Sequence, residues 1–155
     1  MKEQEQLNKL FTDLYDGSPW IDVNIVNTLD EITAKEAATK PFPYFNSIWE
    51  IVNHTINWRE TVLKRVNGEN IESPDDNYFS FIRDRSENSW QKTKERFRDS
   101  QVIWLKAIKK FKSKDLDAKH DFSTFSNYEL ILAILQHDAY HLGQIRLMKK
   151  LVQLT

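Results

Sequence analysis

Apolar residues recur with helical spacing in four long stretches of the chain, and nowhere does the strict alternation of a strand persist. The first stretch runs from about Glu3 to Tyr15 and the second from Ser47 to about Asn67. The third covers about Asn88 to Phe111, and the fourth covers about Asn127 to Val152. Each stretch carries one apolar face, so the pattern predicts an all-α protein in which four long helices pack as a bundle.

Helix starts are marked by a serine or threonine followed three residues later by a glutamate. In this capping box, the hydroxyl and the carboxylate satisfy free backbone N–H groups of the first turn. The pattern occurs at Thr33 to Glu36, Ser47 to Glu50 and Ser126 to Glu129. It predicts a brief helix over residues 34–39 and the starts of the second and fourth long helices. Asn67-Gly68 then ends the second long helix.

The three segments that connect the long helices have weaker sequence patterns. Residues 20–32 form either a short helix begun by Asp22 or an extended crossing segment, and the pattern does not separate the two. The stretch from Gly68 to Ser89 is polar and turn-rich, so it is expected to cross an end of the bundle or to cover a site. Its aromatic cluster at residues 78–81 favours packing against the helices. Lys112 to Asp121 is expected to be a charged, solvated loop with His120 exposed.

Length and composition narrow the class of protein. A chain of 155 residues is expected to form one domain, residues 1–155. The formal net charge is −1 and no long block of one sign occurs, which argues against nucleic-acid and membrane-surface partners. No apolar run could span a bilayer and no signal peptide is recognised, so a cytoplasmic location is expected. Cysteine is absent, so any thiol chemistry would need a thiol brought by a substrate.

The fourth helix carries histidines on its apolar seam. The seam is Leu130, Ile134, His137, His141, Gln144, Met148 and Leu151. Because His137 and His141 are four residues apart, both imidazoles can reach one ion at roughly 2.1 Å. A buried imidazole without a partner costs about 1 to 3 kcal/mol, so this pair requires hydrogen-bonding partners or a shared cation.

A third histidine lies on the second helix. His54 shares a stripe with Ile51 and Trp58 and should face the core; taken alone, such a residue is usually a satisfied core histidine. Beside the pair on the fourth helix, it completes a set of three imidazoles. Three neutral imidazoles leave open positions on a divalent ion, as in a catalytic site. Zinc or nickel is favoured over magnesium or calcium, with iron and manganese still open.

Two neighbouring residues are candidates for the catalytic chemistry. His137-Asp138-Ala-Tyr-His141 resembles the HExxH pattern of metalloproteases, with aspartate where that pattern has its glutamate base. Asp138 points about 100° away from His137, so it can orient a ring, pair with a neighbouring helix or be solvated. Gln144 can bond a ligand, a water or a substrate, or it can bond another helix. No glycine-rich phosphate loop is present.

Three segments together resemble the DinB-like family of metal-dependent enzymes: DGSPWIDVNIVNTLDEIT, SIWEIVNHTINWRE and HDAYHLGQI. The likeness covers nearly the whole chain. It implies a four-helix bundle with long connections in up-down-down-up order, often as a homodimer. It also implies a nickel or zinc site carried by His54, His137 and His141. Relatives include transferases that use low-molecular-weight thiols such as bacillithiol or mycothiol.

Three functions compete at this stage. The leading one is a metal-dependent enzyme whose ion activates water or a low-molecular-weight thiol against a small-molecule substrate, hence a hydrolase or a thiol S-transferase. The alternative is a non-catalytic metal-binding or stress-response module of the same fold. Direct DNA binding is opposed by the balanced charge and the lack of a basic stripe.

Overall fold

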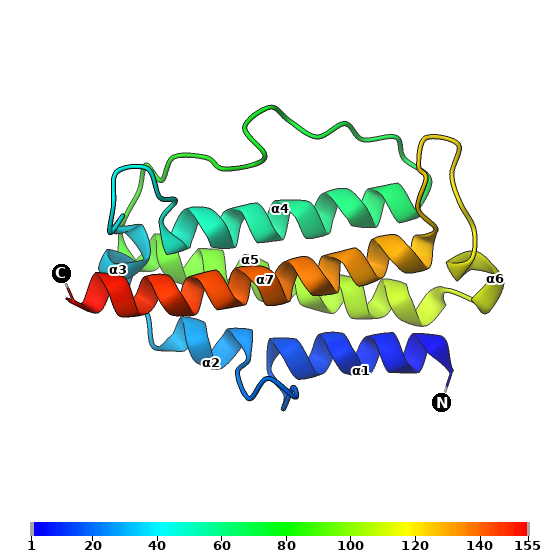
Figure 1. Cartoon of the computed structure of the whole chain (residues 1–155), viewed down its shortest axis with the longest axis horizontal. Helices are drawn as coiled ribbons and strands as arrows, with labels where there is room; N and C mark the ends of the chain where they lie inside the picture. The colour runs from blue at the N-terminus through cyan, green and yellow to red at the C-terminus, as the bar shows by residue number, and fades with distance from the viewer. Residues whose placement is uncertain (1, 155) are drawn as a thin grey trace.

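The computed structural model describes residues 2–154, and its helices pack lengthwise into a bundle (Figure 1). The four long helices are α1 (Glu3–Tyr15), α4 (Ile48–Val66), α5 (Glu87–Lys110) and α7 (Asn127–Leu154). The connections hold the short helices α2 (Ile25–Asp30), α3 (Ala34–Ala38) and α6 (Ser113–Leu116). Within residues 2–154 the only strand-like pairing is an isolated bridge between Lys119 and Ser126. The prediction of an all-α bundle is confirmed.

The order of helix directions is up-down-down-up. Helices α1 and α7 run one way along the bundle, whereas α4 and α5 run the other way (Figure 1). α4 packs against α7 and α5, and α1 packs against α5. Because α4 and α5 point in the same direction, the chain between them returns along the whole length of the bundle. This return segment, residues 67–86, arches over α4 (Figure 1).

The predicted helix boundaries follow from capping contacts. The hydroxyls of the three predicted box residues accept hydrogen bonds from the third-position amides, at distances of 3.2 to 3.3 Å. At the end of α4, Gly68 adopts a φ of +93° and donates its N–H to the carbonyl of Arg65 at 2.9 Å. The N–H of Glu69 reaches the carbonyl of Lys64 at 3.0 Å. This pair of bonds is the Schellman ending, which favours glycine.

Two connections differ from the sequence interpretation. Residues 20–32 contain helix α2, but its cap is Asn24, whose side-chain oxygen accepts from the N–H of Asn27 at 2.8 Å. Asp22 instead lies in a turn with a φ of 58°. The loop expected at residues 112–121 contains helix α6, and His120 there is half-buried. The expectation of a fully solvated loop was wrong because one apolar residue, Leu116, is buried in the core.

The core is divided into two apolar clusters along the bundle axis. One cluster includes Trp49 and Trp90, and the other includes Trp104 and Ile131. The large rings pack closely: the centroids of Trp49 and Trp90 lie 5.0 Å apart. Buried polar residues from α4, α5 and α7 occupy the middle of the bundle. The fold therefore places polar side chains at the level of the candidate site.

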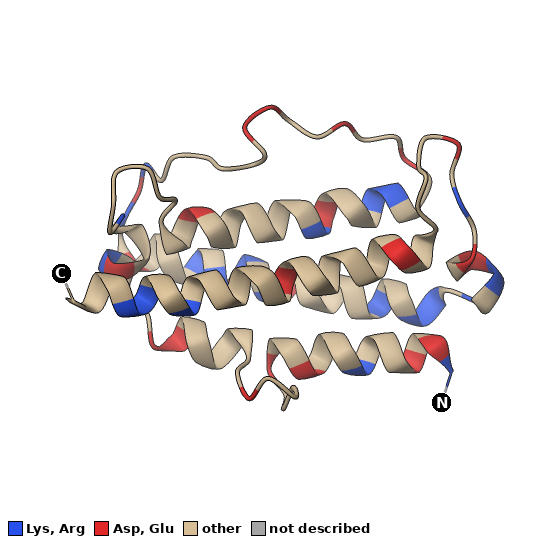
Figure 2. Ribbon diagram, in the orientation of Figure 1, with Lys and Arg blue, Asp and Glu red and all other residues tan. Residues whose placement is uncertain are grey.

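Charged residues of both signs occur on each of the four long helices. Figure 2 shows basic and acidic positions spread along the bundle. The distribution agrees with the near-zero net charge of the sequence. Among residues 2–154, no helix is both long enough and apolar enough to cross a membrane.

Candidate metal centre

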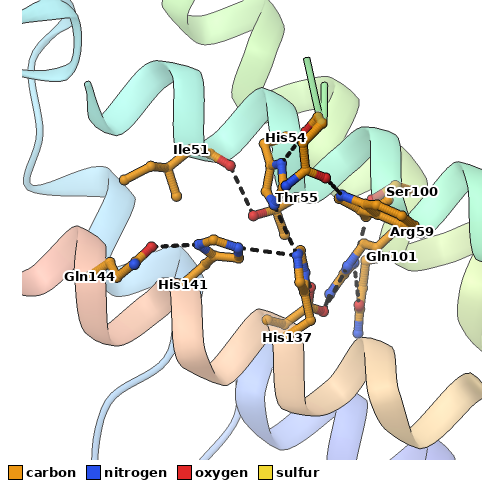
Figure 3. Close-up of polar contacts among 12 residues, drawn as sticks. Ile51, His54, Thr55, Arg59, Ser100, Gln101, His137, His141 and Gln144 are labelled. Carbon is orange, nitrogen blue, oxygen red and sulfur yellow. Dashed lines mark hydrogen bonds and ion pairs between the residues drawn. The ribbon is translucent and has the colours of Figure 1, made fainter. Parts of the chain in front are cut away.

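His54 from α4 meets His137 and His141 from α7 in the middle of the bundle (Figure 3). The Nε2 atom of His137 lies 3.0 Å from Nε2 of His54 and 3.1 Å from Nε2 of His141. The meeting depends on the side-by-side packing of α4 and α7, because 83 residues separate the first two histidines. The predicted convergence of all three imidazoles is therefore present.

Hydrogen bonds on the far side of two rings fix where their protons reside. The Nδ1–H of His54 donates to the backbone carbonyl oxygen of Asn77 at 2.6 Å. The Nδ1–H of His141 donates to Oε1 of Gln144 at 2.6 Å. Because a carbonyl oxygen can only accept, both rings carry a proton on Nδ1. In the neutral rings, Nε2 is then left as a bare lone pair facing the other histidines.

This arrangement fits a bound cation. His137 has one Nε2 proton at most, so it can satisfy one of the two neighbouring lone pairs but not both. Two nitrogens bound to a tetrahedral ion at about 2.1 Å lie about 3.4 Å apart, which is close to the observed spacing. An ion among the three Nε2 atoms would satisfy every lone pair at once. The three histidines can therefore hold a divalent metal.

Burial keeps two of the ligands in the form that binds metals. It is the main cause that lowers the pKa of His141 to about 4, and the nearby His137 adds to the shift. Burial also lowers the pKa of His54 below its ordinary value of 6.5. Both imidazoles are consequently neutral near pH 7, and a neutral imidazole is the ligand form.

The return segment, residues 67–86, contacts His54 through Asn77 and Phe79. Asn77 and Tyr78 have φ values of 50° and 62°, an uncommon conformation for residues with side chains. The conformation aims the Asn77 carbonyl at His54 and lets its side-chain oxygen accept from Nε1 of Trp58 at 2.9 Å. Phe79 stacks on the His54 ring with centroids 4.0 Å apart. Tyr78 and Phe79 thus pack against α4, as the sequence indicated for this cluster, whereas Phe81 is exposed.

Asp138 is buried and paired with Arg59 of α4. Figure 3 shows Arg59 and Gln101 close to the three histidines. Its Oδ2 accepts from Nε and Nη2 of Arg59 at 2.8 and 2.6 Å. Nη1 of Arg59 donates to Oε1 of Gln101 at 2.9 Å. The other oxygen, Oδ1, lies 4.0 Å from Nδ1 of His137, and neither atom has a hydrogen-bond partner. Of the three interpretations of Asp138, the structure shows pairing with a neighbouring helix, and solvation was wrong.

Comparison with known proteins agrees with this architecture. Residues 23–145 match the sequence profile of the DinB superfamily. The chain belongs to the DinB superfamily. A crystal structure described as a conserved protein of locus from Enterococcus faecalis matches with a TM-score of 0.76, over 100% of this chain and 99% of that chain. At 14% identity, that likeness shows a shared fold. No curated protein sequence matches the chain.

A cavity of about 670 Å³ opens above the histidines of this DinB superfamily member. Gln144 lies in its wall, where Nε2 donates to the hydroxyl of Tyr140 at 2.9 Å. Gln144 therefore bonds a neighbouring ligand on its own helix and not another helix. Asp138 is 1% exposed and lies outside the lining. The catalytic roles of Asp138 and Gln144 stay predictions.

The sequence did not single out Arg59 or Asn77. A signal for Arg59 was available, since it interrupts an apolar row on α4 that includes Ile56 and Val62. Asp138 interrupts the matching row on α7, between Ile134 and Leu142. A buried charge is costly unless it is paired. One charge of each sign in two buried rows therefore predicts an ion pair between the two helices. No comparable signal marks Asn77, because a backbone carbonyl has no side-chain signature.

Proposed function

We propose that this protein is a metal-dependent enzyme that activates water or a low-molecular-weight thiol against an electrophilic small molecule, as a hydrolase or a thiol S-transferase. The carrying observation is the convergence of three imidazole Nε2 atoms beneath an open cavity. When bound, such an ion is a Lewis acid that makes a nucleophile available at neutral pH. Three imidazole ligands favour zinc or nickel.

The remaining residues of the site would serve binding and orientation. Asn77 and Gln144 hold the protons of His54 and His141 on Nδ1, so that Nε2 faces the ion. The hydroxyl of Tyr140 accepts a hydrogen bond from Gln144, which leaves its own proton free to meet a substrate. Tyr140 is 64% exposed at the cavity, so a substrate reaches it without a rearrangement.

A second function, a non-catalytic metal-binding or stress-response module of the same fold, is favoured by one observation. Water activation by a zinc enzyme commonly relies on a carboxylate base near the open position. Here the nearest carboxylate, Asp138, is committed to Arg59, and no aspartate or glutamate lines the cavity. This observation also favours a thiol over water as the nucleophile within the enzyme proposal. The expected homodimer stays a prediction.

The test is the metal content of untagged protein purified without a nickel column, measured by plasma mass spectrometry. The wild type is expected to carry about one ion per chain, because one set of three ligands is present. His137→Ala is expected to carry none, and His120→Ala serves as the matched control because His120 lies outside the cluster. Circular dichroism checks that each variant keeps its helices.

The outcomes separate the two functions. No ion in the wild type after incubation with zinc and nickel salts, or equal metal content in wild type and His137→Ala, contradicts the site. With a confirmed ion, thiols and water are compared as nucleophiles toward a panel of electrophiles. Turnover that disappears with the ion supports the enzyme. Stoichiometric metal without turnover across the panel supports the non-catalytic module.

A further inference from the structure

The cavity above the three histidines has a wall without charge. Its fourteen lining residues include no lysine, arginine, aspartate or glutamate. In a protein with 29% charged residues, a wall of this size would ordinarily include several of them. Exposed apolar surface of this kind marks binding sites when it lines a concave region.

Two of the amides in that wall are already hydrogen-bonded within the protein. The side-chain oxygen of Asn77 is held by Trp58, and its carbonyl is held by His54. Gln144 uses its oxygen on His141 and its nitrogen on Tyr140. The other polar side chains of the wall, including Asn46 and the hydroxyls of Tyr44 and Tyr140, are uncharged. Because much of the wall is apolar, apolar contact is expected to supply a large part of the binding energy.

Charged groups near the cavity are held by other partners. Asp138 and Arg59 are buried outside the lining and paired with each other. The guanidinium of Arg65 lies 5.5 Å from the ring of Trp58, and it donates to the carbonyl of Ile71 at 2.9 and 2.6 Å. Arg65 is not part of the cavity lining. A carboxylate or phosphate on the body of a substrate would lose its hydration in this cavity without meeting a cationic side chain, which is costly.

We propose that the substrate of this site is an uncharged, apolar compound bearing a ring, which packs against Ile51, Leu147 and Met148 and the rings of Phe45 and Phe79. The proposal rests on the proposed function, since it assigns a substrate class to the same cavity. The volume of about 670 Å³ is in the range of cavities that hold molecules of drug size. The only formal charge that such a substrate meets is the ion at the cavity floor.

The experiment measures fluorescence binding of two probes to metal-free protein at pH 8 in the presence of a chelator. One probe is neutral N-phenylnaphthylamine, and the other is anilinonaphthalene sulfonate, the same ring system with one negative charge. Wild type is expected to bind the neutral probe at least about tenfold more tightly, because the wall offers no cationic partner to the sulfonate. Metal-free protein is used so that the result does not depend on whether the chain is a metalloenzyme.

Two lysine variants test where the discrimination arises. Leu147, 58% exposed, lines the cavity, whereas Leu10, 47% exposed, lies on α1 outside it. Leu147→Lys is expected to reduce the preference for the neutral probe by about threefold or more, because it places a cation in the wall. Leu10→Lys is expected to leave the ratio unchanged. Both positions tolerate a charge because they are exposed.

Three results would overturn the proposal. The first is no binding of the neutral probe, and the second is equal affinity for the two probes in wild type. The third is an equal change of the ratio in Leu147→Lys and Leu10→Lys, which would place the probes outside the cavity. A failure of metal binding in the wild type would leave these measurements intact and would contradict the proposed function alone.

Discussion

At the scale of single residues, two buried polar atoms without hydrogen-bond partners face each other behind His137, one of the three candidate metal ligands. Oδ1 of Asp138 and Nδ1 of His137 are both without hydrogen-bond partners and lie 4.0 Å apart. Buried polar atoms ordinarily have partners, so a small rotation of the imidazole toward the carboxylate is favoured. Arg59 holds the carboxylate in place by its other oxygen. Asp138 is thus positioned to orient His137 when an ion draws on Nε2.

Asp138→Asn is expected to weaken metal affinity by about 10- to 100-fold, the usual effect of losing a carboxylate that supports a ligating histidine. It also leaves the buried guanidinium of Arg59 without its counter-charge, so stability falls as well. Affinity is measured by competition with a chelator at a temperature where circular dichroism shows a folded variant. Asp99→Asn, at an exposed position of α5, is the control. Unchanged affinity in Asp138→Asn would contradict the orienting role.

Tyr15 offers a pH test away from the metal site. Burial raises the pKa of this phenol from 10.0 to about 12. The unfolded chain therefore releases the proton first, and stability falls as pH rises from 10 toward 12. Tyr15→Phe is expected to lack this component of the fall, as measured by urea unfolding across that range. Tyr44→Phe, at a fully exposed position, should behave like wild type. Identical pH profiles for all three proteins would rule out the raised pKa.

At the scale of helices, the glycine that follows α4 and the glycine within α7 have opposite effects on stability. A Cβ added at Gly143, within α7, would meet nothing within 4 Å. Gly68 has a φ of +93° and ends α4. Glycine is thus required at one position and costs helix stability at the other.

Gly143→Ala is expected to raise the free energy of unfolding by about 0.5 to 1 kcal/mol, because alanine loses less backbone freedom on folding. Gly68→Ala is expected to lower it by about 1 kcal/mol or more, because alanine is strained in the left-handed conformation. Chemical denaturation of the two variants and wild type measures both effects. A change of the same sign in both variants would contradict this explanation.

The success of the sequence in predicting helices depended on local signals. The starts of α3, α4 and α7 followed from capping boxes, whose contacts lie within four residues. The helix at Ile25–Asp30 stayed ambiguous, because its cap residue Asn24 also suits a turn. The helix at Ser113–Leu116 was missed, because the burial of one leucine decides its position and the surrounding residues are charged.

At the scale of the whole molecule, the bundle and the three histidines could be predicted because helical spacing places residues on faces, and faces pair in a bundle. The relative register of two helices has no such local signature. It decides that Arg59 meets Asp138, and it shifts the buried face of α7 so that His137 lies at its edge, with 25% of the side chain exposed. The path of residues 67–86 likewise depends on contacts with helices already packed.

The wide separation of the ligands along the chain has a consequence for biosynthesis. His54 leaves the ribosome 83 residues ahead of His137, and α7 is made after the other helices described within residues 2–154. A nascent chain that has completed α4 and α5 offers a single imidazole from this cluster, too few to retain an ion. Under the proposed function, metal capture would have to wait until α7 docks, so that the ion would join an assembled bundle and select chains that have reached the correct topology.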